Sequence, residues 1–143
     1  MLGTVNSPRV VCLRDFKKDT DLMYSVIDFC PHGELYALLN KVGFTEEHTK
    51  AISLQIAHGL RDIHNCRIAN LDLNPSNILI DEYFGLKITN FSCAHLFDEK
   101  LEIGKWGSQQ FMSPELIDRS LKAIDEDLRN ADIWSWGILL FVL

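Results

Sequence analysis

Residues 70–77, N-L-D-L-N-P-S-N, include the side chains of this sequence that are best suited to chemistry. The segment carries one carboxylate, Asp72, and Asn77 follows it by five residues. A carboxylate can accept a proton, and amide oxygens can bind a hard cation. Asn, Asp and Pro are also the residues that turns use, so a plain turn is the competing interpretation. The motifs elsewhere in the chain favour the chemical interpretation.

Four further motifs stand in a regular order around this segment: D-F-C-P-H-G-E-L at 28–35, N-F-S at 90–92, S-P-E at 113–115 and D-I-W-S-W-G at 132–137. Together they resemble the eukaryotic protein kinases, whose catalytic loop reads H-R-D-L-x-x-x-N and is followed by D-F-G and A-P-E. Residues 107–115, G-S-Q-Q-F-M-S-P-E, are similar to the stretch that seats the peptide substrate in that family. The resemblance runs from about residue 8 to residue 143.

The resemblance implies a role for each polar residue of this region. Phosphoryl transfer depends mainly on positioning and on charge neutralisation. By analogy with the family, Asp72 stands at the proton-acceptor position and Asn77 at the first magnesium-ligand position. Asn90 stands at the second metal position, and Asn74 stands where the family has a lysine that steadies the phosphate. The implied cofactors are ATP and Mg²⁺, bound weakly or not at all.

The resemblance also implies an adenine nucleotide site at the hinge. Ile27, Asp28 and Cys30 match hinge positions that border the adenine, although a plain core role is nearly as good an explanation for Ile27. Glu34 matches a residue near the ribose and could equally be a solvated carboxylate at a helix start. Leu79 matches a position that lines the same site.

Several departures from the family pattern predict impaired catalysis. Asn90 replaces the metal-binding carboxylate, which removes the charge that offsets dehydration of Mg²⁺. Asn74 replaces the usual lysine, Leu71 the usual arginine and Ser92 the usual glycine. Residues 93–107 contain no Ser, Thr or Tyr that could be phosphorylated. We therefore predict a pseudokinase that keeps the fold for binding or regulating a protein partner.

Two alternatives remain open at this level. The chain could be part of an active serine/threonine kinase that phosphorylates proteins, or a truncated gene product without function. The sequence contains no G-x-G-x-x-G loop, and the helix that begins near Asp132 runs to the end of the chain. We therefore expect part of a kinase domain, with residues 1–30 as the end of the N-terminal lobe and the hinge. Residues 31–143 would form part of the C-terminal lobe, ending in its central helix.

The expected elements position these residues as that fold requires. The clearest helix covers 46–65, because Thr45 is a good N-cap and an apolar stripe recurs through Ile52, Ile56, Leu60 and Ile63. Strands at 77–80 and 86–89 should form a hairpin after the Asp72 segment. Strands at 10–13 and 22–28 should flank a turn at 17–21. Short helices are expected at 34–41 and after Ser113, and Asp132 should open the last helix. The fold class is α+β.

Composition limits the other function classes. Of the 143 residues, 47% are hydrophobic and 24% charged, which is typical of a folded protein. The net charge of −6 argues against a nucleic-acid partner. The apolar stretch at 133–143 is too short to cross a bilayer, so no membrane partner is expected. The four cysteines lack C-x-x-C spacing, and we expect reduced thiols in a cytoplasmic protein.

Overall fold

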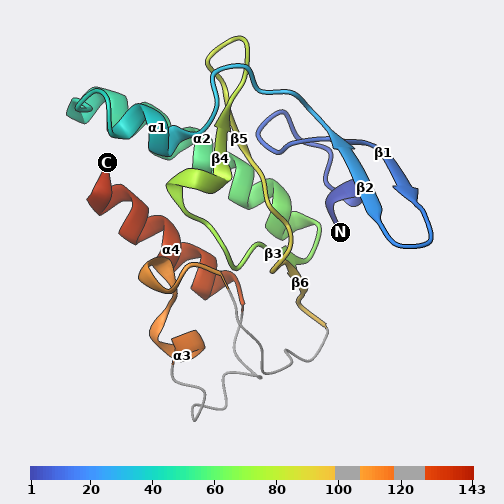
Figure 1. Ribbon diagram of the computed structural model, residues 1–143. Coiled ribbons are helices and arrows are strands. Elements are labelled where there is room, and N and C mark those ends of the chain that lie inside the picture. The colour runs from blue at the N-terminus through green and yellow to red at the C-terminus, as the bar shows by residue number, and fades with distance from the viewer. Residues whose placement is uncertain (99–106, 118–127) are drawn as a thin grey trace.

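The computed structural model describes residues 1–98, 107–117 and 128–143. It has the small α+β architecture expected of part of a protein-kinase-like fold. A two-stranded hairpin lies to one side of a mainly helical body, and the short η1 helix (Leu2–Thr4) precedes it (Figure 1). The helical body carries the Asp72 segment near its centre.

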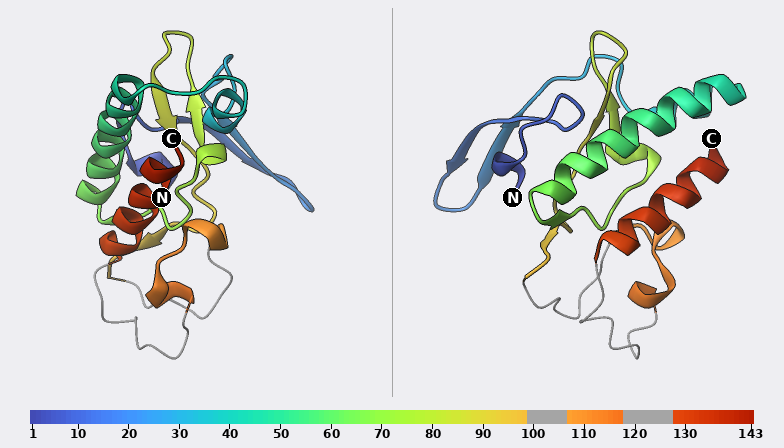
Figure 2. Two further views of the ribbon diagram at one scale, coloured as in Figure 1. Left: turned by 90° about the vertical axis from the view of Figure 1, so that its left-hand side faces the viewer. Right: turned by 180° about the vertical axis from the view of Figure 1, so that it is seen from behind.

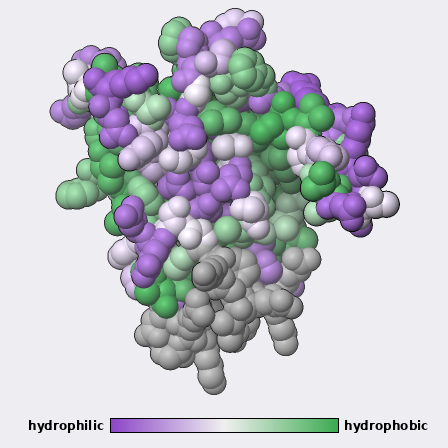
Figure 3. All heavy atoms as spheres, in the orientation of Figure 1, coloured by the Kyte–Doolittle hydropathy of each residue, from purple (hydrophilic) through white to green (hydrophobic). Residues whose placement is uncertain are grey.

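The hairpin consists of β1 (Leu13–Lys18) and β2 (Met23–Ile27), paired antiparallel with a bulge between Leu13 and Asp15. The predicted first strand at 10–13 is therefore wrong, because the strand begins where the prediction ends. Val10 instead makes an isolated bridge to Ile88. Hydrophobic and hydrophilic side chains both reach the surface over the hairpin (Figure 3). All five residues of β2 are exposed, so this strand has no alternation of buried and exposed side chains. The sequence therefore lacks the alternating apolar pattern from which a strand's bounds are predicted.

The long helix α2 (Glu46–Asn65) agrees with the predicted bounds. The Thr45 side chain accepts a hydrogen bond from the backbone N–H of His48, and the Thr45 N–H donates one to Nδ1 of the His48 ring, which completes a capping box. The predicted stripe is buried, with at most 9% of each side chain exposed. The short helix α1 (Leu35–Leu39) precedes α2 and buries Leu35.

Two small sheets follow α2. The strands β4 (Ile78–Ile80) and β5 (Leu86–Ile88) form the predicted hairpin, and Ile78 and Ile88 are paired and buried in the main core. The pairing of β3 (Ile68–Ala69) with β6 (His95–Leu96) was not predicted. Each of these two strands has two residues, which is too short to leave a periodic signal.

The last described elements are η3 (Gln109–Phe111), α3 (Pro114–Ile117) and α4 (Arg129–Val142). Helix α4 packs against α2, and the two lie side by side in the view from behind (Figure 2). Asp132 lies within the first turn of α4 and not at its N-cap, which is Leu128. No helix within the described ranges is long and apolar enough to cross a membrane.

Candidate functional site

The Asp72 segment is shaped by its own side chains. Asn74 precedes η2 (Pro75–Asn77), and its Oδ1 accepts hydrogen bonds from the backbone N–H groups of Ser76 (3.0 Å) and Asn77 (3.2 Å). Pro75 occupies the first position of η2, where its missing N–H costs nothing. Asn74 is therefore a buried capping residue that turns the chain toward β4.

The carboxylate of Asp72 receives five hydrogen bonds from the described residues. Its Oδ2 accepts from the side-chain amides of Asn77 (2.8 Å) and Asn90 (2.9 Å). Its Oδ1 accepts from the Asn74 amide (3.0 Å) and from both the backbone N–H (2.8 Å) and the hydroxyl (3.1 Å) of Ser108. We call these five residues the Asp72 cluster. Residues spread over 36 positions of the chain thus meet at one half-buried carboxylate.

Asp132 fixes the backbone at the start of this segment by hydrogen bonding. Its side chain is fully buried, and its two oxygens accept the backbone N–H groups of Asn70 and Leu71, each at 2.8 Å. His64 Nε2 lies 2.8 Å from the same carboxylate. Leu71 has a φ of +60°, a conformation that costs a non-glycine residue energy and that these bonds maintain. His64 therefore has a structural role beside Asp132, and Asp132 fixes the backbone at the start of the segment.

Gly107 allows Ser108 to reach Asp72. A Cβ at this position would lie 2.4 Å from the carbonyl oxygen of Leu71 and 2.9 Å from Asp72 Oδ1. Gly107 also has a φ of +54°, which side chains rarely tolerate. Sequence reasoning placed Gly107 and Ser108 in a substrate-seating stretch and missed their contact with Asp72. The glycine directly before a hydroxyl residue was the available signal.

The residues at the implied magnesium position do not fit a divalent cation. The side-chain nitrogen of Asn90 lies 2.9 Å from Asp72 Oδ2 and 3.2 Å from Asn77 Oδ1. Asn90 thus presents N–H donors, and not an oxygen, to the Asn77 oxygen at the first implied metal position and to the Asp72 carboxylate beside it. A cation requires oxygen ligands, preferably charged, at this place. Within the described parts of the chain, no three His, Cys, Asp or Glu side chains are grouped to hold a metal.

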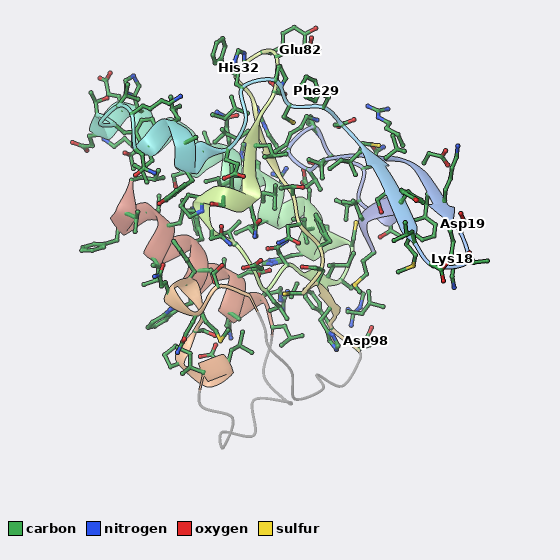
Figure 4. All side chains as sticks on the ribbon, in the orientation of Figure 1. Lys18, Asp19, Phe29, His32, Glu82 and Asp98 are labelled. Atoms are coloured by element: carbon green, nitrogen blue, oxygen red, sulfur yellow. The ribbon has the colours of Figure 1, made fainter. Side chains whose placement is uncertain are left out.

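The residues predicted to form the adenine nucleotide site each make contacts of a different kind. Cys30 is buried, and its carbonyl accepts the N–H of Gly33. Burial raises the pKa of its thiol. Glu34 and Leu79 face each other in an isolated antiparallel bridge, so α1 and β4 are joined at this point. Ile27 ends β2 and is 38% exposed. Phe29, in the segment that the resemblance predicts to be the hinge, projects from the chain between β2 and α1 (Figure 4).

The Asp28 side chain belongs to an ion-pair network at the base of the hairpin. It accepts hydrogen bonds from the Cys12 N–H (3.1 Å), Arg14 Nε (2.7 Å) and Lys87 Nζ (3.2 Å). Burial alone would raise the pKa of this carboxyl, but the three donors outweigh it and hold the pKa below its ordinary value. The side chain thus links β1 to β5. All four cysteines of the chain are free thiols.

A groove of about 420 Å³ opens beside the Asp72 cluster. It lies between α1, η2, η3 and α4. Asn74 and Ser108, both hydrogen-bonded to Asp72, form part of its wall. Tyr36, Phe111 and Ile138 add apolar surface. The groove therefore combines a polar end at the cluster with an apolar wall.

Comparisons with known proteins agree with this architecture. A family model described as "Protein kinase domain" matches residues 1–143. The chain is 35% identical to "Ribosomal protein S6 kinase alpha-1" of Homo sapiens over 144 residues. It is 35% identical to "Ribosomal protein S6 kinase 2 alpha" of Gallus gallus and 33% identical to "Ribosomal protein S6 kinase alpha-2" of Homo sapiens. Each alignment covers 99% of this chain but only 18–19% of the relative, so the chain spans about a fifth of their length.

Proposed function

The chain belongs to the protein kinase domain family, and from this premise we propose that it is a pseudokinase domain. In this proposal the kinase fold is kept for binding or regulating a protein partner, and Mg²⁺-dependent phosphoryl transfer is lost or very weak. Four free thiols are compatible with a cytoplasmic protein, which is part of the same proposal.

The hydrogen bonding of Asp72 carries the proposal. A carboxylate that acts as proton acceptor must present an oxygen to the substrate hydroxyl. Both Asp72 oxygens are instead engaged, by two donor groups on Oδ2 and three on Oδ1. Of the four described side chains that hydrogen-bond to the carboxylate, three are neutral carboxamides. Phosphoryl transfer needs groups that neutralise the negative charge of the phosphate, and carboxamides carry no charge. None of the described side chains that hydrogen-bond to Asp72 carries a positive charge.

The groove beside the cluster supports a protein as the partner. Its wall combines the exposed aromatic ring of Tyr36 with apolar side chains of α4 and polar groups of η2. A short peptide segment could bury apolar side chains there and hydrogen-bond to the polar end. Asn74 and Ser108 would lie at that end, so a bound segment would contact the cluster directly.

A phosphotransfer assay tests the catalytic half of this proposal. The chain and Asp72→Asn are each incubated with Mg²⁺, labelled ATP and a mixture of serine- and threonine-containing peptides. We expect the same background incorporation for both, because Asp72 does not act as a proton acceptor. Incorporation that requires Mg²⁺ and is lost in Asp72→Asn would refute the proposal. Circular dichroism of both proteins provides the control that they are folded.

A second candidate is an active serine/threonine kinase, and one observation favours it. Asp132 holds the backbone of Asn70 and Leu71 in a defined conformation, with Asp72 and Asn77 retained next to it. The related proteins named above are called ribosomal protein S6 kinases. In this alternative the hinge at Cys30 and Glu34 would hold ATP and a protein would be the substrate. The same assay separates the two candidates.

A further inference from the structure

The orientation of the Asn90 side chain is determined by groups on both of its sides. Its nitrogen faces Asp72 Oδ2 and Asn77 Oδ1, two acceptors that match its two N–H bonds. Its oxygen accepts the hydroxyl of Ser92 at 2.7 Å and the Ser92 N–H at 3.3 Å. A rotated amide would place oxygen against the Asp72 carboxylate and N–H groups against the Ser92 N–H. The contacts with Asp72, Asn77 and the Ser92 N–H therefore favour one orientation, and the Ser92 hydroxyl, which can donate or accept, is compatible with it.

We infer that the Asn90 amide takes the place of a divalent cation, linking Asp72 to Asn77 so that the cluster assembles without metal. This inference rests on the proposed function, because it concerns the same cluster. It adds that the folded arrangement of the cluster does not depend on Mg²⁺. A metal ion entering between Asp72 and Asn77 would have to displace two N–H donors. Within the Asp72 cluster, Asp72 contributes the one carboxylate that would offset the dehydration of the ion.

One substitution should convert this cluster into a cation site. In Asn90→Asp, a second carboxylate oxygen would stand about 2.9 Å from Asp72 Oδ2, where the amide nitrogen now lies. Two carboxylates so close repel each other, and they need a bound cation or a shared proton to stay together. The variant would then offer two carboxylates and the Asn77 oxygen to one ion, which is a suitable ligand set for Mg²⁺ or Mn²⁺.

Thermal unfolding of the full 143-residue chain tests the inference. The chain, Asn90→Asp and the control Asn6→Asp are each unfolded at neutral pH in EDTA, and then in millimolar MgCl₂ or MnCl₂. Asn6 is exposed, so its substitution makes the same change in charge away from the cluster. We expect no cation effect on the unsubstituted chain. Asn90→Asp should lose roughly 5–10 °C of Tm in EDTA and regain much of it with either cation.

Two results would overturn the inference. One is a dose-dependent rise in Tm of the unsubstituted chain with Mg²⁺ that Asn90→Ala removes. The other is a Tm of Asn90→Asp in EDTA equal to that of Asn6→Asp. If Asn90→Asp does not fold, electron paramagnetic resonance of Mn²⁺ titrated with the unsubstituted chain decides. Free Mn²⁺ throughout supports the inference, and bound Mn²⁺ refutes it.

These outcomes are separable from those of the proposed function. Mg²⁺-dependent stabilisation without phosphotransfer would refute the cation-free cluster and leave the pseudokinase proposal intact. Phosphotransfer that depends on Asp72 would refute the pseudokinase proposal by a different measurement. Neither experiment uses the readout of the other.

Discussion

Removal of the Asp132 carboxylate should destabilise the whole chain. In Asp132→Ala the backbone N–H groups of Asn70 and Leu71 lose their acceptor at a position with no solvent exposure. His64 loses its partner at the same time. The substitution thus leaves two main-chain donors and one ring nitrogen unpaired, close to the strained backbone of Leu71.

The size of the effect follows from these contacts. Each buried donor left without a partner costs about 1–3 kcal/mol. With partial relaxation and some entry of water, we expect a total loss of about 3–5 kcal/mol in the free energy of unfolding. Small domains have about 5–15 kcal/mol in all, so this loss is a large share of the total. Asp132→Asn retains one acceptor and should lose about half as much, roughly 2 kcal/mol.

Urea unfolding followed by tryptophan fluorescence measures this loss, since Trp134 and Trp136 both lie on α4. With a typical slope of about 2 kcal/mol/M, the midpoint of Asp132→Ala should fall by roughly 2 M. Asp21→Ala is the control, because Asp21 is an exposed residue next to the hairpin turn. In a double-mutant cycle with His64→Ala, the coupling energy isolates the share of the His64 contact.

A loss below about 0.5 kcal/mol in Asp132→Ala, the range of ordinary surface substitutions, would refute this reasoning. It would mean that water or another group satisfies the two N–H donors. The order of effects is a second check: Asp132→Asn must lie between the unsubstituted chain and Asp132→Ala. A larger loss for the asparagine variant would show that its N–H groups clash with the donors.

Two further predictions concern Gly107 and Asp28. Gly107→Ala should reduce stability by about 2–4 kcal/mol, because its φ is unfavourable for alanine and the new Cβ would approach the Leu71 carbonyl oxygen at 2.4 Å. Urea unfolding measures it, and a loss equal to that of an exposed Gly43→Ala control would contradict it. For Asp28, the folded-state pKa lies below the unfolded value, so its contribution is present above the unfolded pKa and is lost as pH falls through the folded pKa. In Asp28→Asn, stability should therefore fall less steeply with pH below about pH 4. Thermal unfolding at a series of pH values from 5 downward measures this dependence. The same dependence of Tm on pH in both proteins would contradict the role of the Arg14 and Lys87 contacts.

Local signals explain which elements the sequence predicts well. The bounds of α2 follow from the Thr45 cap and a single apolar stripe, both of which act within the helix. The β4–β5 hairpin follows from two apolar runs around Gly85. In contrast, β1 carries Lys17 and Lys18, which suggest a turn, and only pairing with β2 makes this segment a strand. Its misplacement reflects tertiary context overriding propensity.

In the candidate site too, the sequence predicts which residues come together but not how their side chains are oriented. The spacing of Asp72, Asn77 and Asn90 predicts that they belong together, and the structure brings them into direct hydrogen-bonding contact. The sequence cannot reveal which end of the Asn90 amide faces Asp72, because Ser92 and Asn77 decide this in three dimensions. For the same reason, the five donors on Asp72 emerge only when the folded chain is seen.

The exposed hairpin has a consequence for local unfolding. All of β2 and most of β1 are exposed, so little apolar area is lost to water when the two strands separate. Lys18 and Asp19 lie at the tip, far from the helical body (Figure 4). The amide hydrogens of β1 and β2 should therefore exchange with solvent through openings that leave α2 intact. The same openings would offer trypsin its first cleavage at Lys17 or Lys18, while the ion pairs of Asp28 keep the base of the hairpin attached.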